Sequence, residues 1–178
     1  MWFVDAAHFV HGSFLGYLWC LVRYFVPSPS GRKRYNVLGA LNAVTHRMVR
    51  VSNHSYINAL SVCDLLGQLA SSAGRLPLTL VLDNARYQRC ALVQQAAQSR
   101  GIELLFLPPY SPNLNLIERV WKFVKKESLA SYSLATYEAF ITAIDGCLDR
   151  LHSKHKAQMD TLLTHQFQTF DNVPVLSA

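Results

Sequence analysis

The chain has 178 residues, which suits one domain whose apolar core is large enough to fold without disulfides or a structural metal. Hydrophobic residues make up 51% of the chain and charged residues 16%, which excludes the composition of a disordered protein. Lys and Arg number 17 against 11 Asp and Glu, and the net charge of +6 favours a polyanionic partner, either a nucleic acid or an anionic membrane surface.

The sequence contains no run of roughly 20 apolar residues, so we expect no membrane-spanning helix. No basic residue precedes the first apolar run, which argues against a secretory signal and for a cytoplasmic protein. None of the four cysteines forms a C-x-x-C pair, which excludes zinc-ribbon and thioredoxin-like motifs.

The first half of the chain predicts mainly strands. Residues 2–10 form a short apolar run around a single carboxylate, Asp5, which is typical of a strand buried on both faces. After a Pro-, Ser- and Arg-rich loop, residues 35–44 and 48–52 predict two strands joined by a short turn. Residues 56–72 have apolar side chains at helical spacing and predict a helix.

The second half alternates strands and helices. Residues 78–82 predict a buried strand, and residues 89–99 predict a helix that is capped by Gly101. Residues 102–107 predict another strand, which a proline-rich segment ends. Two amphipathic helices over 114–127 and 134–151 follow. The order predicts an α/β fold in which three antiparallel strands and then alternating strands and helices form a mixed sheet, with helices on both faces.

Three acidic residues occupy positions that stability alone does not explain. Asp5 lies within an apolar strand, Asp83 ends another, and Glu118 lies near the start of a helix. Burying an ionised carboxylate costs several kcal/mol unless a cation or hydrogen-bond donors meet it, and three converging carboxylates repel one another without a metal. Oxygen ligands of this kind select Mg²⁺ or Mn²⁺.

Each of these residues also has a structural explanation when taken alone. Backbone donors can hold Asp5 at a strand end, and Asp83 with Asn84 is a common turn pair. Glu118 follows Asn115 by three residues, as in a capping box, and precedes Lys122 by four, as in a helical ion pair.

The three acids taken together favour the metal-site interpretation, because their arrangement resembles a known family. Asp83 and Glu118 are separated by 34 intervening residues. The matching segments are residues 3–8 (FVDAAH), 36–41 (NVLGAL), 82–87 (LDNARY) and 107–118 (LPPYSPNLNLIE). They resemble the catalytic domain of the mariner-related bacterial transposases of the insertion sequence 630 family.

The resemblance implies a ribonuclease H-like fold with a five-stranded mixed sheet, in which residues 1–151 form the DDE catalytic domain. Asp5, Asp83 and Glu118 would be the catalytic residues and would hold two Mg²⁺ or Mn²⁺ ions about 3.5–4 Å apart. The implied reaction is cleavage of DNA at transposon ends and strand transfer to a TA-containing target. A homodimer associated with the nucleoid is also implied.

The family's recognition of transposon ends usually belongs to helix-turn-helix modules that precede the catalytic domain. No room for them exists before Asp5, so we expect that region to be absent from this chain or to be supplied by a separately encoded DNA-binding chain. Residues 152–178 are expected to form a C-terminal helix and tail. Many relatives carry His five residues after the second aspartate, where this chain has Gln88.

Contacts with DNA are expected from two basic clusters and two amides, and mostly with phosphates. The residues are Arg32, Lys33, Arg34, Asn84, Asn115, Arg119, Lys122, Lys125 and Lys126. For each cation the structural alternative is an ordinary solvated surface residue, and for each amide a turn or cap residue.

Two other functions remain open at this point. One is a truncated, catalytically inactive transposase fragment that binds DNA or a partner subunit. The other is a cellular nuclease that acts on RNA/DNA hybrids, which fits the fold but not the spacing between Asp83 and Glu118.

Overall fold

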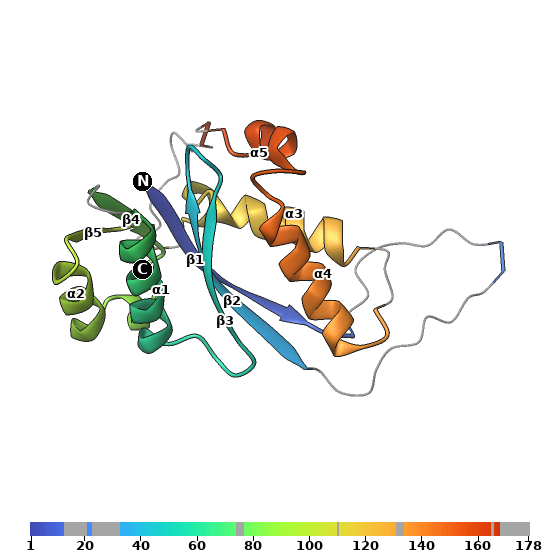
Figure 1. Cartoon of the computed structure of the whole chain (residues 1–178), viewed down its shortest axis with the longest axis horizontal. Coiled ribbons are helices and arrows are strands. Elements are labelled where there is room, and N and C mark those ends of the chain that lie inside the picture. Colours follow the sequence, from blue (N-terminus) through green and yellow to red (C-terminus); the bar gives the residue numbers. More distant parts are fainter. Residues whose placement is uncertain are drawn as a thin grey trace, which may run out of the picture.

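The computed structural model describes residues 1–12, 21–22, 33–73, 77–109, 111–130, 134–164 and 166–167. Within them, one five-stranded sheet has the strand order β3-β2-β1-β4-β5 and carries helices on both faces (Figure 1). The α/β fold predicted from the sequence is confirmed.

Three strands form the antiparallel part of the sheet. β1 (Trp2–Val10) pairs with β2 (Arg34–Asn42), which pairs with β3 (Met48–Asn53). β2 ends two residues earlier than predicted, because the Asn42 side chain accepts hydrogen bonds from the backbone N–H groups of Val44 and Thr45 at 2.9 and 2.8 Å. Such a bond turns the chain out of the strand.

The other two strands are parallel to β1. β4 (Leu78–Leu82) pairs with β1, and β5 (Ile102–Phe106) pairs with β4. The helix α1 (Ala59–Ala73) precedes β4, and the short helix η1 (Arg86–Gln88) and α2 (Ala91–Gln98) connect β4 to β5. Gly101 follows α2 with a φ of 64°, a conformation that favours glycine at a helix end, as the sequence predicted.

In the part of the chain that the structure describes, four helical segments follow β5. They are η2 (Pro112–Leu114), α3 (Ile117–Ser128), α4 (Tyr137–Asp149) and α5 (Lys156–Leu162). α3 begins three residues later than predicted because η2 forms a separate 3₁₀ turn. α4 begins after Thr136, whose hydroxyl accepts a hydrogen bond from the Ala139 N–H at 3.2 Å and caps the helix.

The side chains of β1 alternate between the two faces of the sheet. Trp2 and Val4 pack with α1 and α2, whereas Phe3, Ala7 and Phe9 pack with α3 and α4 (Figure 1). Asp5 shares the parity of the second set, so its side chain points toward α3. Met159 of α5 and Leu163 belong to the same apolar cluster as α3 and α4. In the described part of the chain, no helix is long and apolar enough to cross a membrane.

Candidate active site

Asp5 and Asp83 come from neighbouring parallel strands. The ladder between β1 and β4 pairs Phe3 with Val81 and Val4 with Leu82. Asp5 and Asp83 are the next residue on each strand, so the same register places them side by side. Asp5 is buried, with 8% of its surface exposed, whereas Asp83 is exposed at the strand end.

Glu118 reaches the same region from the first turn of α3. With Asp83 it lines a cavity of about 490 Å³, whose other walls are the η1 segment and the proline-rich segment after β5. The structure therefore places Asp83 and Glu118 on one cavity, with Asp5 on the strand beside Asp83.

The charges of the two other acids act on Asp5. Burial, the negative charge of Glu118 and, to a lesser extent, that of Asp83 raise the pKa of Asp5 from 3.8 to about 7, against the opposing hydrogen bonds from the Ala6 backbone and the Trp121 side chain. A carboxyl with this pKa is half protonated near neutral pH. A cation bound among the three acids would favour the ionised form.

Trp121 holds the carboxylate of Asp5 in place. Its indole Nε1–H donates a hydrogen bond to Asp5 Oδ2 at 2.9 Å, and both residues are buried. Gly39 lies opposite Asp5 in the β1–β2 ladder. A Cβ on Gly39 would lie 2.8 Å from Trp121 Cη2 and 3.1 Å from Ile117 Cδ1, so the absence of a side chain makes room for the indole. The sequence analysis did not predict this hydrogen bond.

Asn115 connects the start of α3 to the strand that carries Asp5. Its Nδ2 donates to the carbonyl of Val4 at 3.1 Å, and its side chain does not cap α3, so the capping-box interpretation is wrong. The buried Oδ1 of Asn115 has no hydrogen-bond partner. Within the described residues, Glu118 also forms no ion pair with Lys122, so neither structural explanation for Glu118 applies.

Two arginines at this cavity were missed by the sequence analysis. Arg86 and Arg89 line it together with Asp83 and Glu118, and both are exposed. The only sequence signal was that they follow Asp83 by three and six residues in the loop after a parallel strand, where ligands of open sheets commonly bind. Their charges can meet phosphate oxygens that approach the three acids.

Tyr87 and Gln88 lie between these arginines in sequence. Burial and the negative charges of Asp83 and Asp5 raise the pKa of Tyr87 to about 12, so its phenol stays protonated beside the two aspartates. Gln88 is fully buried, and among the described residues neither polar atom of its amide has a partner in good hydrogen-bond geometry. It therefore does not line the cavity as an exposed proton-handling group.

The structure distributes the nine residues expected to contact DNA over several places. Asn84 and Asn115 line the cavity with the acids, and exposed Lys122 lies beside Glu118 in an adjoining cavity. Arg119 instead donates hydrogen bonds to backbone carbonyls after α5. Lys125 and Lys126 are exposed in the last turn of α3.

The other basic cluster lies far from the acids. Arg34 pairs with Val10, five residues beyond Asp5 on β1, which is roughly 17 Å along the strand. Lys33 lies 5.2 Å from the centre of the Tyr137 ring. Arg32 lies outside the described residues.

The donor set at the candidate site fits a hard divalent cation. Three carboxylates and the unpartnered Asn115 Oδ1 are oxygen ligands of the kind that Mg²⁺ and Mn²⁺ prefer. Among the described residues, no three His, Cys, Asp or Glu side chains stand close enough together to form a ready metal-binding group. The fit therefore rests on the chemistry of the donors and on the raised pKa of Asp5.

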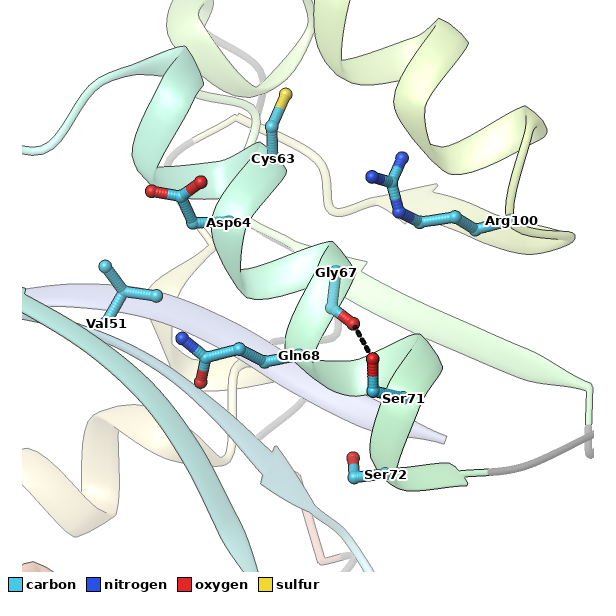
Figure 2. A pocket seen from close by; sticks show the side chains of 8 residues that line it. All are labelled: Val51, Cys63, Asp64, Gly67, Gln68, Ser71, Ser72 and Arg100. Carbon is cyan, nitrogen blue, oxygen red and sulfur yellow. Dashed lines mark hydrogen bonds between the residues drawn. The ribbon is translucent and has the colours of Figure 1, made fainter.

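A second hollow lies on the other face of the sheet. It has a volume of about 760 Å³ and lies between β3, α1 and the residues after α2 (Figure 2). In Figure 2 Cys63 points away from Asp64 and Gln68, so these side chains do not converge on one point. The Ser71 hydroxyl donates to the Gly67 carbonyl of the same helix at 3.0 Å. We assign no chemistry to this hollow.

Comparison with known sequences gives one family and one curated relative. The family model described as DDE superfamily endonuclease matches residues 1–141. The uncharacterized protein y4pE/y4sA of Sinorhizobium fredii is 33% identical over 63 residues, which are 35% of this chain and 44% of the relative.

Comparison with solved structures gives transposases and retroviral integrases. A pre-cleavage Mos1 transpososome matches with a TM-score of 0.60 at 12% identity, over 95% of this chain and 57% of that chain. The HTLV-2 integrase catalytic core domain in complex with magnesium matches with a TM-score of 0.54 at 15% identity, over 84% and 83% of the two chains. The simian T-cell lymphotropic virus intasome matches with a TM-score of 0.58 at 15% identity, over 99% and 59%.

At these identities the likeness shows the fold alone. It confirms the ribonuclease H-like fold that the sequence predicted. The chain spans less than half of the curated relative and less than two thirds of the transpososome and intasome chains.

Proposed function

Because this chain belongs to the DDE superfamily endonucleases, we propose that it is a metal-dependent enzyme that cleaves DNA at transposon ends and joins them to target DNA. DNA is the proposed substrate and target, in agreement with the positive net charge. The active assembly is proposed to be a homodimer at the nucleoid in the cytoplasm.

One observation supports this proposal more than any other. The negative charges of Glu118 and Asp83 act on buried Asp5, although burial and these charges disfavour its ionised form, and Asp83 and Glu118 line one cavity. Such an arrangement is costly for a structural role, because it stores repulsion without a compensating cation. It is suited to holding Mg²⁺ or Mn²⁺, which when bound would activate the attacking oxygen and stabilise the leaving oxygen of a phosphodiester.

The other residues of the site have roles that follow from their contacts. Trp121 orients Asp5 through its N–H group, and Asn115 fixes the start of α3, and hence Glu118, against β1. Arg86 and Arg89 bind the phosphates that flank the reacting bond.

The direct test compares nicking of a DNA duplex by the wild-type chain and by Asp5→Asn, Asp83→Asn and Glu118→Gln in Mg²⁺ and in Mn²⁺. We expect each substitution to lower the rate by at least about 100-fold, since each removes a charged ligand. Glu103→Gln is the matched control, because Glu103 lies on β5 and accepts a hydrogen bond from Thr79 at 2.7 Å, away from the cavity. Retained cleavage in all three variants would refute the proposal.

The alternative of an inactive DNA-binding fragment predicts a different result. The chain would bind DNA without nicking it, and calorimetric titration with Mn²⁺ would show no binding that depends on the three acids. Binding of Mn²⁺ that Asp5→Asn abolishes would exclude this alternative.

A further inference from the structure

Arg119 holds the backbone of the chain that leaves α5. Its Nη1 donates to the carbonyls of Leu162 and Thr164 at 3.0 and 2.9 Å, and its Nη2 donates to the carbonyl of Gln166 at 2.9 Å. The guanidinium carbon also lies 5.9 Å from the centre of the Phe167 ring. We call Thr164, Gln166 and Phe167 the C-terminal segment.

These contacts have a clear physical basis. The last carbonyls of a helix have no partner within it and carry partial negative charge, which a cation at the helix end stabilises. Arginine has five N–H donors in a rigid fork, so one side chain can satisfy several carbonyls at once. Arg119 directs three hydrogen bonds to this backbone, and these would have to be broken or shared for it to bind a phosphate.

The C-terminal segment forms one side of a second cavity, of about 520 Å³. Thr164 and Gln166 line it together with Glu118 and Lys122. All the lining residues except Pro112 are polar or charged, which is typical of a surface that binds a hydrated or charged ligand. Lys122 is exposed there and available to phosphate oxygens.

The second cavity adjoins the first. Pro112, Asn115 and Glu118 line both. Glu118 thus lies between a cavity with Arg86 and Arg89 and a cavity with Lys122. A DNA strand whose reacting phosphodiester lies at the three acids has cations for its phosphates on both sides.

Building on the proposed function, we propose that the second cavity holds the DNA strand adjoining the reacting phosphodiester, with the C-terminal segment as one wall. Arg119 is then a positioning residue, which keeps that wall in place instead of binding a phosphate. Lys122 is the phosphate-binding residue of this cavity. Thr164 and Gln166 offer uncharged hydrogen-bond donors to the same strand.

The experiment measures DNA binding by anisotropy with a labelled duplex, without divalent ions, over a series of NaCl concentrations. The variants are Arg119→Met, Arg119→Lys, Lys122→Met and a chain that ends at Leu163, the last residue in the described part of the chain that is buried in the core. Arg100→Met is the matched control, since Arg100 is an exposed cation that lines neither cavity and is not among the expected DNA contacts. Hydrogen exchange of the DNA-free protein reports the order of residues 164–167.

The two roles predict different salt dependences. Lys122→Met should lower the slope of log affinity against log salt by about one, because one phosphate contact is lost. Arg119→Met and Arg119→Lys should both speed exchange of the C-terminal segment and weaken binding about three- to tenfold with an unchanged slope. The chain that ends at Leu163 should bind DNA as weakly as the two Arg119 variants. Adding Arg119→Met to this shortened chain should lower its DNA affinity no further.

Three results would overturn the inference. One is an Arg119→Lys variant that binds like the wild type while Arg119→Met lowers the slope by about one, which would make Arg119 a phosphate contact. Another is unchanged exchange of the C-terminal segment in both Arg119 variants. The third is wild-type binding by the shortened chain.

The test does not depend on catalysis. If the wild-type chain fails to nick DNA but the binding results hold, the proposed activity fails and DNA binding in the second cavity stands. If nicking is normal and the binding results fail, only DNA binding in the second cavity is refuted.

Discussion

The edge of the Trp121 indole lies against the bare backbone of Gly39, so close that a Cβ there would be 2.8 Å from Cη2. Gly39 is also the residue opposite Asp5 in the β1–β2 ladder. The same close approach that packs α3 on the sheet thus brings the Trp121 N–H within 2.9 Å of the Asp5 carboxylate. Packing and site geometry are therefore coupled through one glycine.

Gly39→Ala should disturb both the packing of α3 on the sheet and the position of the Asp5 carboxylate. The added methyl group must displace the indole, which we expect to lower the free energy of unfolding by about 1–3 kcal/mol. A displaced indole also misplaces Asp5, so nicking should fall about 10- to 100-fold. Urea denaturation and a nicking assay measure the two effects.

Gly67→Ala is the control for that change. Nothing lies within 4 Å of a Cβ at Gly67, which is in the middle of α1, so alanine should raise stability by about 0.5–1 kcal/mol and leave nicking unchanged. Equal nicking by Gly39→Ala and Gly67→Ala would contradict the coupling.

The stability of the metal-free protein should fall as the pH rises. The pKa of Asp5 is about 7 in the folded protein, whereas its ordinary value is 3.8. Between pH 3.8 and pH 7 the folded state therefore holds a proton on Asp5 that the unfolded chain has lost. The stability that this proton gives is present below pH 4 and is lost as the pH rises through 7. Asp5→Asn cannot lose a proton and should be more stable than the wild type at pH 8, by on the order of 2 kcal/mol.

Urea denaturation in EDTA at pH 5 and pH 8 measures this effect as the difference between wild type and Asp5→Asn. Adding Mn²⁺ at pH 8 should stabilise the wild type and not the variant, because only the wild type keeps the charged ligand. The same difference at both pH values would show that Asp5 is not strained by its neighbours.

Arg86→Ala and Arg89→Ala should each weaken DNA binding and lower the salt slope by about one, if both arginines bind phosphates. Arg100→Ala is the matched control, since Arg100 is an exposed arginine beside the hollow of Figure 2. Anisotropy titrations over a salt series measure the slopes. Equal slopes for all three variants would remove Arg86 and Arg89 from the DNA surface.

Asn115→Ala and Glu118→Gln separate a side chain that stabilises the metal-free fold from one that strains it. Asn115→Ala removes the donor to the Val4 carbonyl and should cost about 1–2 kcal/mol of stability. Glu118→Gln removes a charge that repels Asp5 and should leave the metal-free stability equal or higher. Thermal denaturation in EDTA measures both, and a Glu118→Gln variant that is less stable than the wild type would show that this charge does not strain the metal-free protein.

The strands could be predicted because their signals are local. β1 and β4 have the predicted bounds, since each is an apolar run that ends at a polar residue or turn. The ends of β2 and α3 differ, because the side chain of Asn42 and the separate turn of η2 decide them. Such ends depend on individual hydrogen bonds that periodicity does not reveal.

The sequence by itself singled out three acids as candidates: Asp5 within a strand, Asp83 after one, and Glu118 at a spacing that resembles a known family. It also determined the order of strands and helices. Only the tertiary structure decided that Trp121 binds Asp5 across 116 residues, that Arg86 and Arg89 line the cavity, and that Arg119 faces the C-terminal segment. Helix and strand periods are properties of neighbouring residues, whereas these contacts join elements whose relative positions are set by packing of the whole core.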